Sequence, residues 1–253
     1  MIHRLARTGL FGLATTLFAL VVAGDDLNGA PNWPTNEFHF TRMYYQGNRY
    51  DRGWRGGSWT TDYPEAEVHF TMGVGRLTRV DIGEARMLKI TDDTIFNYPW
   101  LYAVEVGRWY LDDTDAARLR EYLDRGGFLM VDDFHGTLQW GTFMESMQRV
   151  FPDRPVVEIS DQHEVFHVLY DLNQRIQIPG IAALSRGQTY EQDGVQPHWR
   201  GIYDDTGRLV VAINFNMDLG DAWEHADNPY YPEAMTTLAY RFAVNYVVYS
   251  MTH

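Results

Sequence analysis

Two groups of polar residues follow apolar segments that have the composition of buried strands. Asp132, Asp133 and His135 come directly after the apolar run FLMV at residues 128–131. Adjacent carboxylates can share a proton, so that one has a raised pKa and the other stays ionised, which allows general acid and base chemistry. They can also bind a divalent cation. In a third interpretation both acids only cap the following helix and bind loop amides.

The second group follows the run LVVAINF at residues 209–215. We expect its members to bind a ligand, because carboxylates and amides hydrogen-bond to polar groups and an indole can stack. The candidates are Asn214, Asn216, Asp218, Trp223 and Glu224, with Asp221 between them. The group resembles an acidic calcium loop, but its glycine and its last glutamate are each one position away from the required spacing. A calcium loop is therefore disfavoured.

A metal-binding motif lies between the two groups. Residues 163–167 read H-E-x-x-H, in which His163 and His167 could hold zinc on one helical face while Glu164 acts as the base. The sequence context disfavours this reading, because the predicted helix begins only just before His163. Glu191, His198 and Glu224 are unplaced candidates for the third ligand. The alternative is a partly buried histidine pair at the mouth of a cleft.

The elements that must position these groups alternate between strands and helices. The stretch 110–136 is the clearest: Asp112 to Thr114 offer a cap, apolar residues follow at helical spacing, and Gly126 and Gly127 end the helix before an apolar strand. Further strands are expected at 38–45, 87–90, 101–106, 156–159 and 209–215, and further helices at 62–77, 143–150, 164–172 and 232–250. This order predicts a three-layer α/β/α sandwich with a mainly parallel sheet and flavodoxin-like layering. Sites in such sheets lie at the carboxyl ends of the strands.

The composition excludes several classes of protein. The chain has 253 residues, 45% of them apolar, with 21 basic and 34 acidic side chains, a formal net charge of −13 and no cysteine. The apolar fraction excludes a disordered chain, and the absence of thiols excludes a disulfide scaffold and cysteine catalysis. The negative charge disfavours nucleic acid as a partner.

The first residues have the pattern of a targeting segment. In residues 1–23, Arg4 and Arg7 precede an apolar run that ends in small residues, which predicts a secretory signal peptide. The alternative is a retained anchor, although the run is shorter than the ~20 residues of a spanning helix. We expect a linker at 24–36, a single domain at 37–253, no membrane span after signal removal, and a periplasmic or secreted location.

Aromatic residues suggest a glycan as ligand. Phe, Trp and Tyr make up 15% of the chain, and many of them fall in predicted loops beside Asp and Asn, where rings can stack on sugars. They are Trp54, Trp59, Tyr63, Trp100, Trp140, Trp199, Trp223, Tyr230 and Tyr231. The alternative is that these rings pack loops onto the sheet. The arginines of residues 42–55 could bind an anion or pair with the surplus acids.

Several long motifs resemble a known family. YLDRGGFLMVDDFHG, MQRVFPDRPVVEIS with DQHEVFHVLYDL, and the closing segment from INFNMDLGDAW onward are similar to the bacterial domain-of-unknown-function family 4159, which has no established activity. In that family's pattern a proline usually stands where Glu164 stands here, which further disfavours zinc. The family in turn resembles the class I glutamine amidotransferase-like fold, including ThuA-like proteins. That fold can place a catalytic cysteine where Asp132, Asp133 or His135 stands, so a cysteine-dependent glutaminase is excluded.

Two functions from different classes follow. The favoured prediction is a non-catalytic ligand-binding or envelope assembly module whose partner is a glycan or an envelope protein, with no required cofactor. The alternative is a cysteine-less hydrolase that uses Asp132, Asp133 and His135, with a divalent metal as a possible cofactor. A zinc peptidase through residues 163–167 is the lesser alternative.

Overall fold

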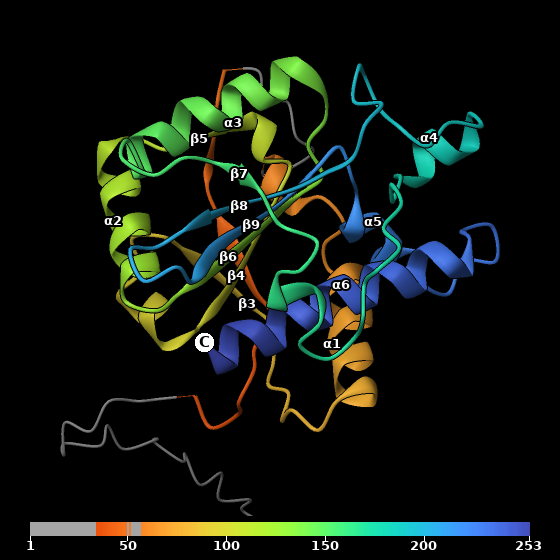
Figure 1. The fold of residues 1–253 in the computed structure, drawn as a ribbon, viewed down its shortest axis with the longest axis horizontal. Coiled ribbons are helices and arrows are strands. Elements are labelled where there is room, and N and C mark those ends of the chain that lie inside the picture. Colours follow the sequence, from red (N-terminus) through yellow and green to blue (C-terminus); the bar gives the residue numbers. More distant parts are fainter. Residues whose placement is uncertain (1–33, 50, 52–56) are drawn as a thin grey trace, which may run out of the picture. The chain divides into compact units, whose positions relative to one another are not determined.

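A seven-stranded sheet forms the centre of the structure, a computed structural model that describes residues 34–49, 51 and 57–253 (Figure 1). The strand order is β3-β1-β4-β6-β9-β8-β7. The strands are β1 (Thr41–Tyr44), β3 (Arg86–Lys89), β4 (Trp100–Val104), β6 (Phe128–Asp132), β7 (Val157–Glu158), β8 (His198–Tyr203) and β9 (Leu209–Phe215), and a separate antiparallel pair joins β2 (Gln46–Gly47) to β5 (Trp109–Tyr110). The five strands from β3 to β9 are parallel, whereas β8 runs antiparallel to both of its neighbours. The predicted α/β class with a mainly parallel sheet is confirmed.

The three central strands β4, β6 and β9 are buried along their whole length. Their register places Leu101 beside Leu129, and Leu129 beside Val211. Such continuous apolar runs are stable only where both faces of the sheet are covered. The apolar sequence of these strands therefore dictates that helices pack on both sides.

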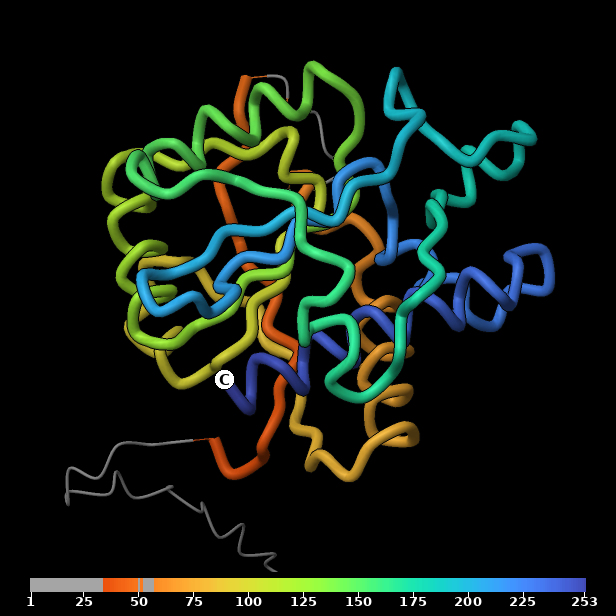
Figure 2. The backbone as a smooth tube through the Cα atoms, viewed as in Figure 1, coloured from red at the N-terminus to blue at the C-terminus, as the bar shows by residue number. Residues whose placement is uncertain are grey.

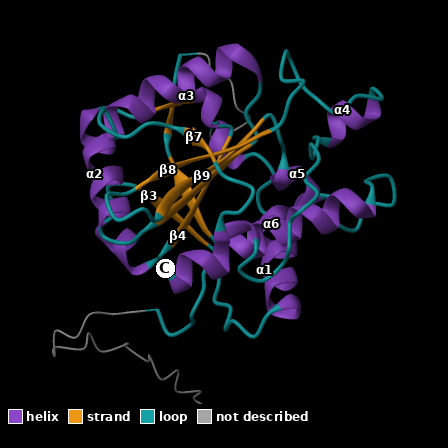
Figure 3. Cartoon of the chain, in the orientation of Figure 1, coloured by secondary structure: helices purple, strands orange, loops and turns teal. Residues whose placement is uncertain are grey.

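Helices cover the two faces of the sheet (Figures 1 and 3). They are α1 (Glu65–Leu77), α2 (Asp113–Asp124), α3 (Gly136–Val150), α5 (Leu219–Glu224) and α6 (Glu233–Thr252), whereas the short helix α4 (Ile181–Ser185) lies away from the sheet. Trp100 and Tyr102 of β4 pack with α1, α5 and α6, whereas Leu101 and Ala103 of the same strand pack with α2 and α3. The period of two along β4 thus separates two apolar cores.

The predicted helix before β6 is confirmed in its details. The Asp112 carboxylate accepts hydrogen bonds from the amides of Thr114 and Asp115, both at 2.9 Å, and so caps α2. Gly126 ends the segment with φ 103°, a conformation that a residue with a Cβ rarely adopts.

Other predicted elements were wrong. The segment 164–172 forms only a 3₁₀ turn at Glu164–Phe166, and the long excursion between residues 172 and 209, in which no helix or strand was expected, contains α4 and the antiparallel strand β8. The backbone trace shows this excursion carrying α4 away from the sheet before β8 returns to it (Figure 2). The helix expected at 62–77 begins only at Glu65, with Pro64 at the N-cap position and no side-chain cap, so Asp62, the polar residue that could have capped it, does not do so. The predicted signal peptide, Trp54, Arg52 and Arg55 lie outside the described residues, as does most of the predicted linker. Among the described residues no helix is both long enough and apolar enough to cross a membrane.

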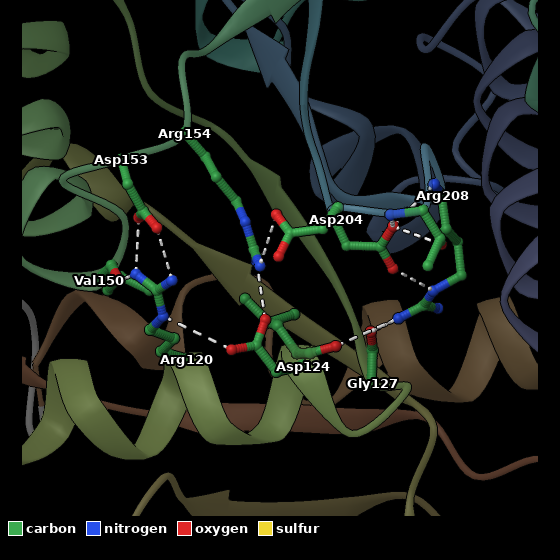
Figure 4. A network of polar contacts seen from close by, with 11 residues as sticks. Arg120, Asp124, Gly127, Val150, Asp153, Arg154, Asp204 and Arg208 are labelled. Atoms are coloured by element: carbon green, nitrogen blue, oxygen red, sulfur yellow. Dashed lines mark hydrogen bonds and ion pairs between the residues drawn. The ribbon is translucent and has the colours of Figure 1, made fainter.

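A network of arginine contacts joins three peripheral segments (Figure 4). Arg120 of α2 donates two hydrogen bonds of 2.7 Å to Asp153, and Arg154 contacts Asp124 at 2.7 Å. Arg208, which precedes β9, donates to the carbonyl of Gly127 at 2.9 Å. The network ties the end of α2 to the segments before β7 and β9, and its exposed pairs each contribute little to stability.

A buried ion pair joins the first strand to α1. Arg42 of β1 is fully buried and donates to the buried carboxylate of Glu67. It also donates to the carbonyls of Trp59 at 3.0 Å and Thr61 at 2.8 Å, and so fixes the loop that leads to Asp62.

We predict that Arg42→Met lowers the free energy of unfolding by about 3–5 kcal/mol, because it leaves the Glu67 carboxylate buried without its partner. Arg42→Met combined with Glu67→Leu should recover much of this loss. Arg120→Met is the control: its partner is exposed, so the loss should be about 0–1 kcal/mol. Urea unfolding measures all three. Equal losses for Arg42→Met and Arg120→Met would contradict the prediction.

Candidate functional site

Three adjacent parallel strands end in the same unusual backbone conformation. The residues that follow β4, β6 and β9 are Glu105, Asp133 and Asn216, with φ values of 53°, 51° and 63°. Asn216 is one residue beyond the end of β9, as Glu105 and Asp133 are beyond the ends of β4 and β6. A left-handed conformation costs a residue with a side chain roughly 1–3 kcal/mol, and such residues gather at functional sites. This edge of the sheet is therefore the candidate site.

Asp132 has a structural task at this edge. It is fully buried, and its Oδ2 accepts hydrogen bonds from the amides of Leu219 at 2.7 Å and Gly220 at 2.9 Å. The hydroxyl of Tyr102 donates to the same oxygen at 3.4 Å. Burial, and next the charge of Asp133, raise the pKa of Asp132 well above its usual value. One sequence interpretation expected Asp132 to bind backbone amides and to cap the helix that follows it. Asp132 does bind amides, but they belong to the first turn of α5 and not to α3.

Asp133 leaves the strand and lies in the turn between β6 and α3. Its amide donates to the carbonyl of Met217 at 3.1 Å, and its Oδ1 lies 3.1 Å from Nε2 of His135. His135 is almost fully buried, its amide donates to Oε1 of Gln139, and its Nδ1 has no hydrogen-bond partner among the described residues. The sequence prediction that Asp133 and His135 act together is consistent with this contact, which orients the imidazole.

Asp133 meets two acids from other parts of the chain. One oxygen each of Asp62, Asp133 and Asp218 lies within 4.8 Å of the others. Asp62 comes from the loop before α1, and Asp218 from the connection between β9 and α5, where its Oδ1 accepts from the amide of Asp221 at 2.8 Å. Burial, followed by the charge of Asp133, raises the pKa of Asp62 and of Asp218 well above the usual value. The set has the oxygen donors that a hard divalent cation prefers.

Asp62 is a site residue that the sequence analysis missed. The pattern Asp-Tyr-Pro-Glu before an apolar helical stretch is typical of a helix cap, and nothing in it indicates contact with residues 133 and 218. The structure gives Asp62 a left-handed φ of 63°. A second buried arginine contact, from Arg42 to the carbonyl of Thr61, holds the residue just before it. Only the three-dimensional position of this loop shows the role of Asp62.

A second set of possible ligands lies on α5. Asp221, Glu224 and His225 each offer one atom within 4.8 Å of the others. Nε2 of His225 lies 3.3 Å from Asp221 and 3.6 Å from Glu224, and the spacing i, i+3, i+4 places the three on one helical face. Burial raises the pKa of Asp221 and of Glu224. This set adds a nitrogen donor to the site.

The other predicted ligand residues are engaged inside the protein. Asn214 is fully buried, and its Oδ1 accepts from the hydroxyl of Tyr246 at 3.0 Å. Asn216 accepts from the amide of Gly136 at 2.9 Å and donates to the carbonyl of Gln196. Trp223 is fully buried. Of the five predicted ligand residues, only Asp218 and Glu224 belong to the two sets described above.

The H-E-x-x-H residues lie in a 3₁₀ turn and not in an α-helix. Nδ1 of His163 accepts from the amide of Val165, while the two ring nitrogens of His167 lie 2.9 Å from Asp171 and from the carbonyl of Asp161. Glu164 pairs with His253 at 3.1 Å. In the described part of the chain, neither histidine belongs to a group of three possible ligands within 4.8 Å. Zinc binding at this motif stays a prediction.

The prediction that the listed aromatic residues are mostly loop residues was wrong. Trp100 lies in β4, Trp140 in α3, Trp199 in β8 and Trp223 in α5, and all four pack against the cores. Trp59 is also packed, and Tyr231 is 4% exposed. Of the rings on this list that the structure describes, two are open to solvent: Tyr63, next to Asp62, is 42% exposed, and Tyr230 is 88% exposed.

Glu105 is a further acid that the sequence analysis did not single out. It follows β4 and lies 3.2 Å from Arg108. Burial, and then the charge of Asp133, raise its pKa to about 9. A strongly raised pKa together with a left-handed backbone marks Glu105 as part of the same edge.

The raised pKa of Glu105 predicts a pH-dependent stability. The folded protein keeps a proton that the unfolded chain releases above pH 4.5, so the free energy of unfolding falls as the pH rises from about 5 to about 9. The contribution of one proton is at most about 1.4 kcal/mol per pH unit. Glu105→Gln should flatten the slope, measured by urea unfolding of chelator-treated protein at several pH values. An unchanged slope would contradict the prediction, and Glu145→Gln, at an exposed position, is the control.

The comparisons agree with the motifs noted in the sequence. Residues 39–251 match the family model described as Domain of unknown function (DUF4159), which spans nearly all of the sheet and its helices. The comparison with curated proteins gives no match. Because the family model covers most of the chain, the chain belongs to the DUF4159 family.

Proposed function

We propose that the protein is an exported binding module that holds a polyhydroxylated ligand, such as a glycan, at the carboxyl edge of β4, β6 and β9. The observation that carries this proposal is the convergence within 4.8 Å of Asp133, which follows β6, with Asp62 from the loop before α1 and Asp218 from the connection between β9 and α5. Carboxyl groups accept hydrogen bonds from hydroxyl groups, and those with a raised pKa, such as Asp62 and Asp218, can also donate one when they are protonated. The pattern of residues 1–23 supports export to the periplasm or beyond.

An exposed ring beside these acids supports a sugar as the ligand. Tyr63 directly follows Asp62 and is 42% exposed. A tyrosine ring offers an apolar face to a sugar and a hydroxyl at its tip. The carboxylates and the ring together match a ligand that has both hydroxyl groups and an apolar face.

The fold also supports a site at this edge. Helices on both faces of a mainly parallel sheet favour a three-layer sandwich of the class I glutamine amidotransferase type. In such sheets ligands bind beyond the carboxyl ends of the strands. Asp133 stands in the turn after β6, where the resemblance would put a catalytic cysteine, so the edge keeps a polar group without a thiol.

A cysteine-less hydrolase is the second candidate, and the contact between Asp133 and His135 favours it. A carboxylate that orients an imidazole is a recurrent arrangement in general base catalysis. His135 and its Nδ1 are buried, however, so the imidazole is poorly placed to reach a substrate. We therefore rank the binding module before the hydrolase.

The binding proposal predicts that the full chain binds at least one of cellohexaose, chitohexaose, xylohexaose and a soluble muropeptide, measured by calorimetry with millimolar Mg²⁺ and Ca²⁺ present. Asp133→Asn should weaken binding about tenfold or more, because it removes a charged acceptor. Tyr63→Ala should also weaken binding, whereas Tyr110→Ala, at a tyrosine that is 43% exposed, should not.

The same samples separate the two candidate functions. Release of new reducing ends by the wild type but not by Asp133→Asn would establish a hydrolase in place of a binding module. Failure of all four probes to bind would overturn the glycan proposal.

A further inference from the structure

We propose that the carboxylates of Asp62, Asp133 and Asp218 together bind one divalent cation. This inference rests on the proposed function, because the cation would form part of the same binding edge. It concerns a set of residues that includes Asp62, which neither the sequence motifs nor the family match points to.

The geometry of the three carboxylates fits a cation between them. Their nearest oxygens lie within 4.8 Å of one another. Oxygen ligands of Mg²⁺ and Ca²⁺ lie about 2.0–2.6 Å from the ion, so two ligands of one ion are separated by at most about 5 Å. The three residues come from the α1 loop, the β6 turn and the start of α5, so that the ion would be held from three directions.

Unpaired buried oxygens at the same place independently indicate a missing ligand. Oδ2 of Asp62 is shielded from solvent and has no hydrogen-bond partner among the residues that the structure describes. Within the same residues, Oδ1 of Asp132, in a side chain that is fully buried at the end of β6, also has no partner. Buried polar atoms are nearly always bonded, so unpaired carboxylate oxygens beside the set call for a cation or a proton.

Two glycines leave the space that these oxygens occupy. A Cβ at Gly220 would lie 2.2 Å from Oδ2 of Asp62, and a Cβ at Gly180 would lie 2.6 Å from Oδ2 of Asp218. Both distances are far below van der Waals contact, so any larger residue would displace the carboxylate. The absence of a Cβ at Gly220 and Gly180 thus leaves room for the carboxylates of Asp62 and Asp218.

The charges around the set also favour a cation. The charge of Arg42 lowers the pKa of Asp62, but its Nε and Nη1 bind Glu67 and two carbonyls, and its Nη2 has no hydrogen-bond partner among the described residues and so does not neutralise Asp62 by direct contact. The neighbouring groups Asp132, Asp221 and Glu224 add further negative charge. A bound divalent ion would offset this repulsion in a partly dehydrated site, where electrostatic attraction is strong.

The set on α5 is the alternative position for an ion. There, however, both oxygens of Asp221 already have partners: Oδ2 accepts from the amide of Ile181 at 2.6 Å, and Oδ1 lies 3.3 Å from His225. The free oxygen of Asp62 therefore favours the first set, and His225 provides a variant that distinguishes the two.

The test is direct binding of Mg²⁺, Ca²⁺ and Mn²⁺ to the chelator-treated full chain, measured by titration calorimetry without any glycan. We expect one equivalent of at least one of these ions per chain. Asp62→Asn and Asp218→Asn should each weaken binding at least tenfold, whereas His225→Gln and the exposed-site control Asp171→Asn should leave it unchanged. Gly220→Ala should also weaken it, because its Cβ displaces Asp62.

A thermal melt shows whether the variants fold. In chelator, Asp62→Asn should melt at or above the temperature of the wild type, because it removes repulsion between acids. The ion should raise the melting temperature of the wild type but not of Asp62→Asn. No binding at millimolar concentration, or loss of binding with His225→Gln but not with Asp62→Asn, would overturn the inference.

The outcome is separable from that of the proposed function. Ion binding without binding of any oligosaccharide would support the cation site and overturn the glycan proposal. Oligosaccharide binding by a protein that binds none of the three ions at millimolar concentration would support the binding module and overturn the cation site.

Discussion

Repulsion between carboxylates at the end of the sheet is the constraint on which the rest of the structure depends. Asp62, Asp133 and Asp218 are held within 4.8 Å, although burial and their mutual charge raise the pKa of both Asp62 and Asp218. Such an arrangement persists only if the surrounding structure determines it. The parallel strands β4, β6 and β9, buried on both faces, provide that rigidity.

The adjacent acids Asp132 and Asp133 have different partners because successive side chains of a strand point to opposite sides of the sheet. Asp132, the last residue of β6, shares the side of the sheet on which Tyr102 lies and binds the amides that open α5. Asp133, one residue later, adopts a left-handed conformation and turns to His135. The first acid fixes α5, and α5 in turn places Asp218 beside the second acid. The two residues are thus linked through an element that lies more than 80 positions further along the chain.

The sequence predicted the parts of this arrangement that depend on local signals. The cap at Asp112, the turn at Gly126 and the apolar strand β6 each follow from a few neighbouring residues, and the positions of Asp133 and Asp218 at strand ends follow from them. The position of Asp62 could not be predicted, because it depends on how the buried Arg42 holds a distant loop. Strand β8 was missed because its sequence HWRGIY lacks a continuous apolar run and is only partly buried. Trp199 lies in this strand. It packs against a core although its sequence context resembles that of a loop.

The carboxylates around the turn after β6 would make a cysteine at this position unreactive. A thiolate at the turn after β6 would face Asp62, Asp218 and Glu105, and carboxylates so close would favour its protonated, unreactive form. A cluster of carboxylates and a reactive thiol are therefore incompatible at the end of the same strand. An edge built from carboxylates instead favours ligands that carry hydroxyl groups or positive charge, and it keeps the requirement for a rigid backbone. Asp133 thus has a left-handed backbone conformation at this turn although the chain contains no cysteine that could use it.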